Sequence, residues 1–349
     1  MTSAPPFRFA GNSDLIRRKR ILALTVIVMV AFSAGCGGSQ ASPPAPHIEH
    51  LTLWLDYTPW GVHVPIYAAE ALGYFARNGL SVSIRPPANV TDPLKLVAYS
   101  KRNTLAIGYM SDVVTAESQG IPVVSVAALV QHHLNCIMTL KRSGITSPRQ
   151  LAGKRIGAAE TPADTVILNT VFKKAGVSGR VQRVNVNYDY VPALLQGRVD
   201  AIEGAYQVWE RIEIQQAGQR VNVIQLQKWG VPDEYELVLL ASRSMINAQP
   251  QLIRRFMRAL GEGETYAVTH PAGAVSLFLK LNRSYDTAKE RTLVQRSWRL
   301  LIPFVKPPSV RFGSQSATRW HRLAVWMYRQ HLVRHLVPTA SLFTEKFPA

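Results

Sequence analysis

The sequence contains few cysteines and few acidic residues. Cys36 and Cys136 are the only cysteines among 349 residues, so a disulfide framework, a four-cysteine zinc site and an iron–sulfur cluster are excluded. Asp and Glu number 22 against 40 Lys and Arg, which gives a net charge of +18. Because 47% of the residues are hydrophobic and only 18% are charged, the composition is not that of a disordered chain. The length predicts two domains, or one domain in two lobes.

Signatures of nucleic-acid binding and of common catalysts are also missing from the sequence. Residues 280–349 hold 13 basic and 3 acidic residues, but the basic ones are separated by apolar residues and accompany no RRM, KH, zinc-finger or helix-turn-helix pattern. No glycine-rich phosphate loop and no Ser-His-Asp pattern is recognisable. His132 and His133 are adjacent, so in an extended segment their side chains point to opposite sides. We therefore expect no nucleic-acid partner and no metal site.

The first 36 residues have the layout of an export signal. Residues 17–20 are all basic, and the uncharged run at residues 21–34 spans about 21 Å as a helix, short of the roughly 30 Å needed to cross a bilayer. Its end, residues 33–36, resembles a bacterial lipobox with Ser33 in place of the usual Leu. This predicts a lipidated Cys36 that anchors an extracytoplasmic protein to the membrane, with an ordinary cleaved signal or an uncleaved anchor as alternatives. Residues 37–48 are expected to form a flexible tether.

The remainder of the chain alternates twice between short apolar strand patterns and helical patterns bounded by glycine. Such alternation predicts βαβ units and largely parallel sheets. The apolar run at residues 235–241 is expected to be a buried strand that carries the chain back to the first lobe, where long amphipathic helices follow. The strands expected before it span residues 51–55, 81–84, 104–108 and 123–129 in the first series, and residues 155–158, 181–186 and 200–203 in the second.

These patterns predict an α/β fold with two lobes, each a mainly parallel sheet flanked by helices, joined by a hinge of two crossing segments. Lobe 1 is expected to comprise residues 49–138 and 238–349, and lobe 2 residues 139–237. Ligands of open α/β sheets bind beyond the carboxyl ends of the strands. The loops at these ends carry rings and carboxylates, and the candidate ligand-binding residues are Asp56, Tyr57, Trp60, His63, Tyr109, Tyr188 and Glu210.

Residues 55–80 carry a recognisable motif, which reads Leu-Asp-Tyr-Thr-Pro, His-Val-Pro-Ile-Tyr, Gly-Tyr-Phe and Gly-Leu in order. It resembles the opening of the periplasmic substrate-binding proteins of the pyrimidine-precursor (thiamine salvage) and thiamine-pyrimidine-synthase-like family. The ordered set of matches is specific for this family although each piece alone is weak. Further pieces that resemble the family lie at residues 123–128, 151–157, 197–204, 230–232, 235–239 and 266–271.

The resemblance implies a type II periplasmic-binding-protein fold and a binding protein of an ABC importer. The expected ligand is a small heteroaromatic, foremost a thiamine pyrimidine precursor of the formylaminopyrimidine or hydroxymethylpyrimidine type. The expected partners are a membrane permease and its ATPase, and the protein is expected to be a monomer. A membrane-associated sensor or scaffold that keeps the fold is the alternative. The basic C-terminal segment is interpreted as a solvated surface, with anionic lipid headgroups or an acidic permease rim as alternatives.

In that family the first-loop acid and aromatic residue and a helix Glu line the ligand cleft, which maps onto Asp56, Tyr57 and Glu210. Aromatic side chains offer flat faces to a pyrimidine, and a carboxylate suits its amine and ring-nitrogen edge. Each residue has a structural alternative, since Asp56 could cap a helix, Glu210 could lie on a solvated helix face, His63 could be a structural hydrogen-bonding group, and Tyr109 and Tyr188 could cover the core.

Two departures from the family pattern bear on specificity. Tyr57 and Trp60 stand where the family usually has Trp then Asn, and Val208 stands where an Asn often precedes the helix Glu. A pocket that loses two amides favours a larger, flatter or less polar ring. Riboflavin-like isoalloxazines therefore remain alternative ligands.

The synthases of this family suggest an enzyme as a further alternative. They use pyridoxal phosphate on a lysine, a nearby histidine and an iron-linked cysteine run. The corresponding segments here, residues 108–112 and 227–231, read Gly-Tyr-Met-Ser-Asp and Gln-Lys-Trp-Gly-Val. Without the amine and the thiolates this chemistry has no supporting residues, so we expect no enzymatic activity and no cofactor.

Overall fold

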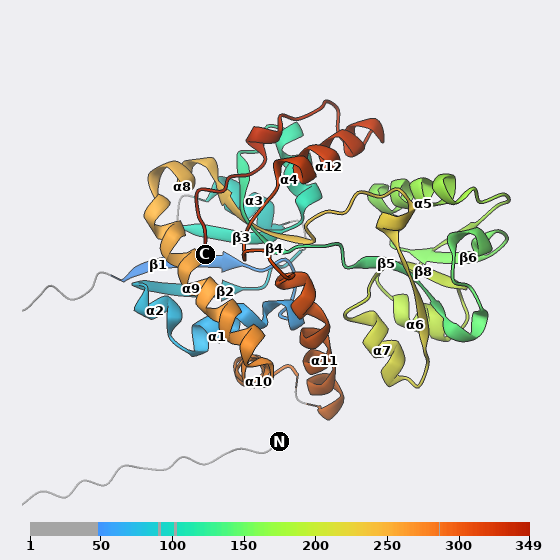
Figure 1. Cartoon of the computed structure of the whole chain (residues 1–349), viewed down its shortest axis with the longest axis horizontal. Helices are drawn as coiled ribbons and strands as arrows, with labels where there is room; N and C mark the ends of the chain where they lie inside the picture. Colours follow the sequence, from blue (N-terminus) through green and yellow to red (C-terminus); the bar gives the residue numbers. More distant parts are fainter. Residues whose placement is uncertain (1–47, 90–91, 101–102, 286) are drawn as a thin grey trace, which may run out of the picture. The chain divides into compact units, whose positions relative to one another are not determined.

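The computed structural model describes residues 48–89, 92–100, 103–285 and 287–349. The expected export signal, the lipidation site Cys36 and all of the tether but its last residue lie outside these residues. The described chain contains two five-stranded sheets flanked by helices (Figure 1), so the predicted α/β fold is confirmed. Among the residues that the structure describes, no helix combines the length and the hydropathy needed to cross a bilayer.

The first sheet has the strand order β2-β1-β3-β10-β4. Strands β2, β1 and β3 pair in parallel, whereas β10 is antiparallel to both β3 and β4. Four strands therefore point in one direction, and β10 runs against them because it brings the chain back from the second sheet. The bounds are β1 Glu49–Trp54, β2 Leu80–Arg85, β3 Thr104–Gly108, β4 Val123–Val130 and β10 Leu237–Ser242.

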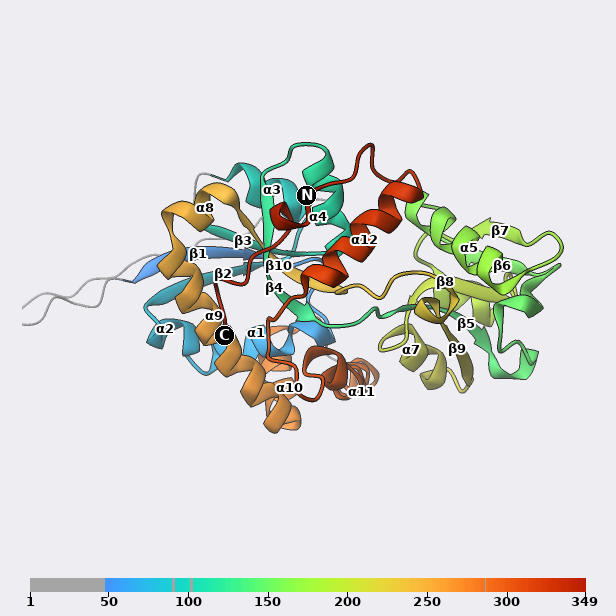
Figure 2. The same cartoon turned by 45° about the horizontal axis from the view of Figure 1, so that its top comes forward.

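Helices cover both faces of the first sheet because its central strands are apolar on both sides. In β10, Leu237, Leu239 and Ala241 pack in one hydrophobic cluster, while Val238 and Leu240 pack in another. The helices whose side chains pack in the first of these clusters, and so cover one face of the sheet, are α1 Val64–Ala71, α2 Tyr74–Arg77, α8 Arg243–Ala248, α9 Pro250–Thr269, α10 Pro271–Leu281 and α11 Ala288–Val305. The other face carries α3 Asp92–Tyr99, α4 Met110–Ser118 and α12 Ala317–Arg329 (Figures 1 and 2).

The second sheet repeats this plan with the strand order β7-β6-β8-β5-β9. Here β5 is antiparallel to β8 and β9, and β6 pairs in parallel with β7 and β8. The bounds are β5 Asn135–Leu140, β6 Arg155–Ala158, β7 Gln182–Asn185, β8 Ala201–Tyr206 and β9 Val221–Gln225, and the helices are α5 Pro162–Ala175, α6 Tyr190–Leu195 and α7 Glu210–Gln216. The second sheet and its helices are therefore built from one contiguous stretch of chain.

Helix α5 shows how local sequence sets these elements. Thr161 accepts a hydrogen bond from the Asp164 N–H at 3.1 Å, and the Asp164 carboxylate accepts one from the Thr161 N–H at 2.9 Å, which forms a capping box. Pro162 occupies the first helical turn, where its missing N–H is not needed. Gly176 ends the helix in the left-handed conformation that glycine adopts without strain.

Two segments cross between the sheets. The first, residues 131–134, joins β4 to β5, and the second, residues 230–236, leads into β10. Strands β5 and β9 were not among the strands expected from the sequence. Because β5 begins at Asn135 in the second sheet, the expected lobe boundary at residue 138 falls within a strand, and the change of sheet occurs before Asn135.

Candidate ligand-binding site

The loop that follows β1 carries a buried hydrogen-bonded triplet. The Trp60 N–H donates to His63 Nδ1 at 3.1 Å, so a neutral His63 ring carries its proton on Nε2. His63 Nε2 lies 2.7 Å from Asp56 Oδ1, and the two side chains are 0% and 1% exposed. Asp56 therefore fixes the tautomer and the orientation of His63, and His63 in turn holds the backbone of Trp60.

Trp60 brings the loop of the first sheet into contact with the second sheet. Its ring stacks on Tyr206, at the end of β8, with centroids 5.7 Å apart and an interplanar angle of 30°. Trp209, before α7, meets Trp60 edge-on at 5.7 Å. Trp60 is only 6% exposed, and Val208 packs with it in the hydrophobic cluster of the first sheet. An aromatic cluster of Trp60, Tyr206 and Trp209 thus joins residues from both sheets.

Tyr109 extends this aromatic cluster from the carboxyl end of β3. Its hydroxyl lies 3.5 Å from that of Tyr206. Burial, together with the nearby carboxylates Asp56 and Glu236, holds the pKa of the Tyr109 hydroxyl well above its usual range. Burial has the same effect on the pKa of Tyr206. Both phenols are therefore neutral hydrogen-bonding groups at any physiological pH.

Glu210 lies at the start of α7 and contacts the backbone of Tyr206. Its carboxylate accepts a hydrogen bond from the Tyr206 N–H at 2.7 Å and so closes the turn between β8 and α7. Burial raises the pKa of Glu210 to about 7, against the lowering effect of the backbone N–H donors. Near neutral pH this carboxyl can accept a hydrogen bond as a carboxylate or donate one as an acid. Of the alternatives raised by the sequence, a solvated helix face does not describe this position.

Two of the predicted site residues are exposed, and among the described residues neither makes a ring contact with the aromatic cluster. Tyr57 is 55% exposed although its neighbour Asp56 is buried, and Tyr188 is 71% exposed. Tyr188 meets Tyr190 edge-on, with ring centroids 6.2 Å apart. The structure therefore brings together five of the seven predicted residues, namely Asp56, Trp60, His63, Tyr109 and Glu210, and leaves Tyr57 and Tyr188 at the surface.

Other residues of the site were not predicted from the sequence. Tyr206 and Trp209 follow the predicted strand at residues 200–203 but are not among the seven candidate residues. Tyr285 lies far along the chain, yet its hydroxyl donates to the Pro59 carbonyl oxygen and its ring meets Trp209 at 6.4 Å. No local pattern around Tyr285 could have revealed this contact, because it depends on how α10 and α11 pack beside the first loop.

The arrangement is suited to holding a flat ring and carries no sign of metal chemistry. Indole and phenol faces bind planar heteroaromatics by offset stacking, and the Glu210 carboxyl and the Tyr hydroxyls are groups that can hydrogen-bond to the polar edge of such a ring. Within the described part of the chain, no group of three or more His, Cys, Asp or Glu side chains is placed to hold a metal ion. The thiol of Cys136 is fully buried in the second sheet, and burial raises its pKa well above the usual range.

Comparison with known proteins shows similarity along most of the chain. A family model described as "NMT1/THI5 like" matches residues 60–274. A formylaminopyrimidine-binding protein of Halalkalibacterium halodurans is 30% identical over 310 residues, which cover 88% of this chain and 93% of the relative. A putative thiamine biosynthesis protein of Haemophilus influenzae is 30% identical over 300 residues, 85% of this chain and 92% of the relative.

Solved structures show the same fold at lower sequence identity. The periplasmic aliphatic sulphonate-binding protein SsuA of Escherichia coli has a TM-score of 0.64 and 14% identity, and the match covers 86% of this chain and 93% of that one. At this identity the likeness concerns the fold alone. It confirms that the two sheets are arranged as in periplasmic binding proteins.

Proposed function

Because the chain belongs to the NMT1/THI5-like family, we propose that it is the substrate-binding protein of an ABC importer and that it captures a thiamine pyrimidine precursor. A ligand of the formylaminopyrimidine type is favoured by the relative that binds such a compound and that aligns over nearly its whole length. Binding, not catalysis, is the proposed activity. The segment that corresponds to the lysine and histidine of the synthases, residues 108–112, contains neither residue type and runs from the end of β3 into α4.

The stacking of Trp60 on Tyr206 is the observation that carries this proposal. The two rings come from loops of different sheets, so a ligand that contacts both stabilises the arrangement in which the sheets are together. A ligand shifts such an equilibrium only by its difference in affinity for the two states. Contacts on one sheet alone would bind a ligand without closing the protein.

Individual roles follow from the geometry of the site. Trp60 is buried against Tyr206, so the partly buried rings of Tyr109, Tyr206 and Trp209 offer surface for the pyrimidine ring. Glu210 offers a carboxyl for the amine and ring-nitrogen edge of that ring. Asp56 acts mainly through His63, which holds the Trp60 backbone. Tyr57 and Tyr188, which are exposed, remain proposed ligand contacts.

The cellular setting is also part of the proposal. An extracytoplasmic location, a lipid anchor on Cys36, a monomeric state and docking to a permease with its ATPase fit a binding protein of an importer. A riboflavin-like ligand is the alternative, supported by the size of the Trp60 indole and by the apolar Val208 beside it. A chain that binds neither class would favour the sensor or scaffold alternative.

A ligand titration of the purified protein tests the proposal. Formylaminopyrimidine, hydroxymethylpyrimidine, thiamine and riboflavin are added separately while the melting temperature is measured. A ligand at one hundred times its dissociation constant adds about 2.7 kcal/mol of stability, which raises the melting temperature by several degrees. We expect a shift with one of the pyrimidines. A shift with riboflavin alone would favour the alternative ligand, and no shift with any compound would contradict the proposal.

Calorimetry of a Glu210 variant then tests the site. Glu210→Gln removes the charged form, so the affinity for an aminopyrimidine should fall by about 1.5–3 kcal/mol, the range for a hydrogen bond to a charged group. Glu213→Gln, one turn further along α7, is the matched control and should change the affinity little. Equal affinities of the wild type and the Glu210 variant would rule out this carboxyl as a ligand contact.

A further inference from the structure

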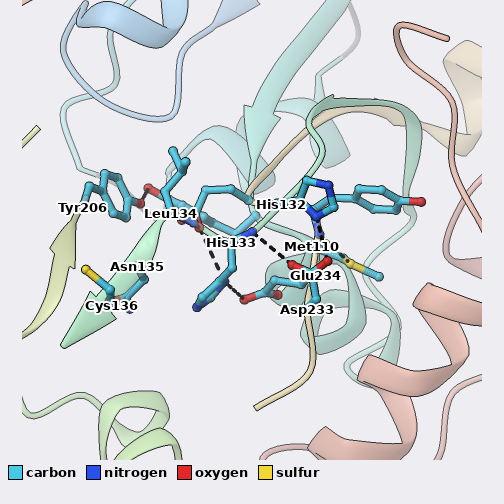
Figure 3. A network of polar contacts seen from close by, with 12 residues as sticks. Met110, His132, His133, Leu134, Asn135, Cys136, Tyr206, Asp233 and Glu234 are labelled. Atoms are coloured by element: carbon cyan, nitrogen blue, oxygen red, sulfur yellow. Dashed lines mark hydrogen bonds and ion pairs between the residues drawn. The ribbon is translucent and has the colours of Figure 1, made fainter. Parts of the chain in front are cut away.

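Ionisable side chains gather where the two crossing segments lie side by side. Figure 3 shows His132 and His133 from the first segment next to Asp233 and Glu234 from the second. His133 Nδ1 lies 3.2 Å from Glu234 Oε1 and 3.5 Å from Glu236 Oε2. The side chains of His133 and Glu236 are only 4% and 5% exposed. An imidazole of the first segment is thus enclosed by two carboxylates of the second.

Glu236 makes a second link between the same two segments. Its Oε2 accepts a hydrogen bond from the Leu134 N–H at 2.7 Å, next to the backbone of His133. At the margin, Asp233 lies 2.8 Å from His132 Nδ1 and accepts a hydrogen bond from the His133 N–H at 3.3 Å. Unlike this partly exposed pair, Glu236 is surrounded by protein, so its contacts are not weakened by water.

The buried carboxyl of Glu236 also reaches the aromatic cluster. The side chains of Tyr206 and Glu236 interact with each other, and the Tyr206 hydroxyl lies 3.5 Å from the Tyr109 hydroxyl. The ring of Tyr206 is the one that stacks on Trp60. A continuous chain of contacts therefore runs from His133 through Glu236 and Tyr206 to Trp60. It links the crossing segments to the contact between the two sheets.

We propose that Glu236, held by His133, is a positioning residue that anchors the Tyr206 hydroxyl and thereby couples movement at the crossing segments to the Tyr206–Trp60 stack. This rests on the proposed function, because it assigns Glu236 to the closure around the ligand. His133 and Glu236 stand on different crossing segments, so a change in the angle between the sheets shifts one against the other. The hydroxyl anchored on Glu236 then moves the Tyr206 ring relative to Trp60.

The electrostatics of the cluster agree with this geometry. Burial alone would lower the pKa of His133, but Glu234, Glu236 and Asp233 outweigh it and raise that pKa to about 9. Glu203 on β8 also lies within electrostatic reach of His133. Burial, with Glu234 beside it, raises the pKa of Glu236 although His133 opposes this. At neutral pH His133 is therefore a cation that lies against the carboxyl groups of Glu234 and Glu236.

A double-mutant cycle on ligand binding tests this coupling. Glu236→Gln and Tyr206→Phe each remove one side of the same contact, so each should weaken binding of the identified pyrimidine about tenfold, mainly through faster dissociation. The double variant should also lose about tenfold, because the contact is already absent in each single variant. If the two substitutions acted independently, the double variant would lose about a hundredfold in affinity. The tenfold gap between this value and the expected loss corresponds to a coupling free energy of about 1.4 kcal/mol. Additive losses would overturn the proposal.

A matched control separates this role from a general effect on folding. Asp233→Asn alters the marginal pair with His132, keeps an amide oxygen that can accept from the His133 N–H, and touches neither Glu236 nor Tyr206. It should therefore leave the affinity within twofold of the wild type. A loss of affinity in Asp233→Asn as large as in Glu236→Gln would mean that any change at the crossing segments weakens binding. That result would contradict a specific role for Glu236.

A readout without ligand keeps this test independent of the proposed function. Coupled Trp60 and Tyr206 rings contribute to the near-ultraviolet circular dichroism, and the Trp60→Phe variant identifies that band. The band should change in Glu236→Gln. In Tyr206→Phe, which lacks the phenol itself, the further substitution Glu236→Gln should change the band no more. In the wild type it should change with a midpoint near pH 9, and this step should be absent in His133→Gln. An unchanged band in Glu236→Gln, or the same pH step in His133→Gln, would refute the coupling even if a pyrimidine binds.

Discussion

Glu203 is a buried carboxyl whose charge opposes folding, which leads to a prediction about pH. It lies on β8 at 0% exposure, and its Oε1 accepts a hydrogen bond from Asn135 Nδ2 at 3.2 Å. Within the described residues, Oε2 has no hydrogen-bond partner. Burial, together with the negative charge of Asp164, raises the pKa of Glu203 from 4.5 to about 8. Replacement by Gln keeps the shape and the acceptor for Asn135 and removes the titration.

The size of the effect follows from proton linkage. Because the folded protein holds the Glu203 proton more tightly than the unfolded chain does, the stability from this group is full below about pH 4.5 and is lost as the pH rises towards 8. Each pH unit in that window costs about 1.4 kcal/mol, so between pH 5 and pH 7 the wild type loses about 3 kcal/mol from this residue. The Glu203→Gln variant does not lose this stability, because Gln does not titrate.

The assay is urea unfolding of the wild type and Glu203→Gln at pH 5, 6 and 7. The amide of Gln has an unpaired donor that costs about 1–3 kcal/mol at every pH. The prediction therefore concerns how the difference in free energy of unfolding between the two proteins changes with pH, not its absolute size. We expect the variant to gain about 3 kcal/mol relative to the wild type from pH 5 to pH 7. Exposed Glu345→Gln is the control and should show no such gain. A constant difference across this range would refute the reasoning.

Three further substitutions test other parts of the fold. Gly263→Ala should destabilise the protein to urea by about 1–3 kcal/mol, because its Cβ would lie 2.4 Å from the Pro65 carbonyl oxygen and force α9 away from α1. Asp56→Ala should lower the free energy of unfolding by about 1–3 kcal/mol by leaving the buried His63 Nε2–H without an acceptor, and an unchanged melting temperature would contradict this pairing. Thr161→Ala should cost about 1 kcal/mol through loss of the α5 cap, whereas Thr161→Ser should retain most of it in the same assay.

Local sequence patterns predicted most elements of the fold because strand and helix periodicity depends on neighbouring residues. The strands Thr104–Gly108 and Arg155–Ala158 have the bounds expected from sequence. Strand β10 was expected near its observed place, but its position between β3 and β4 was not. Strand order depends on pairings between distant segments, and an apolar run does not specify its neighbours.

The candidate site shows the same limit at the level of side chains. Tyr57 and Trp60 lie three residues apart in one loop, yet the first is exposed and the second is buried. An irregular loop has no periodicity from which to predict such a difference. The contact of Trp60 with Tyr206 and the link of Tyr206 to Glu236 join three segments distant in sequence. The sequence pattern predicted aromatic residues in the loops after the strands. Which of these rings contact one another depends on how the two sheets pack.

The place of β10 in the first sheet also has a consequence for how the chain reaches its native state. The second sheet is formed by contiguous chain between β5 and β9, so it can fold as soon as that stretch is available. The first sheet cannot be completed at that stage, because β10, which lies between β3 and β4, follows the whole second sheet in the sequence. Until β10 arrives, β3 and β4 have unpaired edges, which invite pairing with other chains. The slow, aggregation-prone step of folding should therefore be the docking of β10, and a nascent chain that ends before residue 237 should hold a folded second sheet beside an incomplete first one.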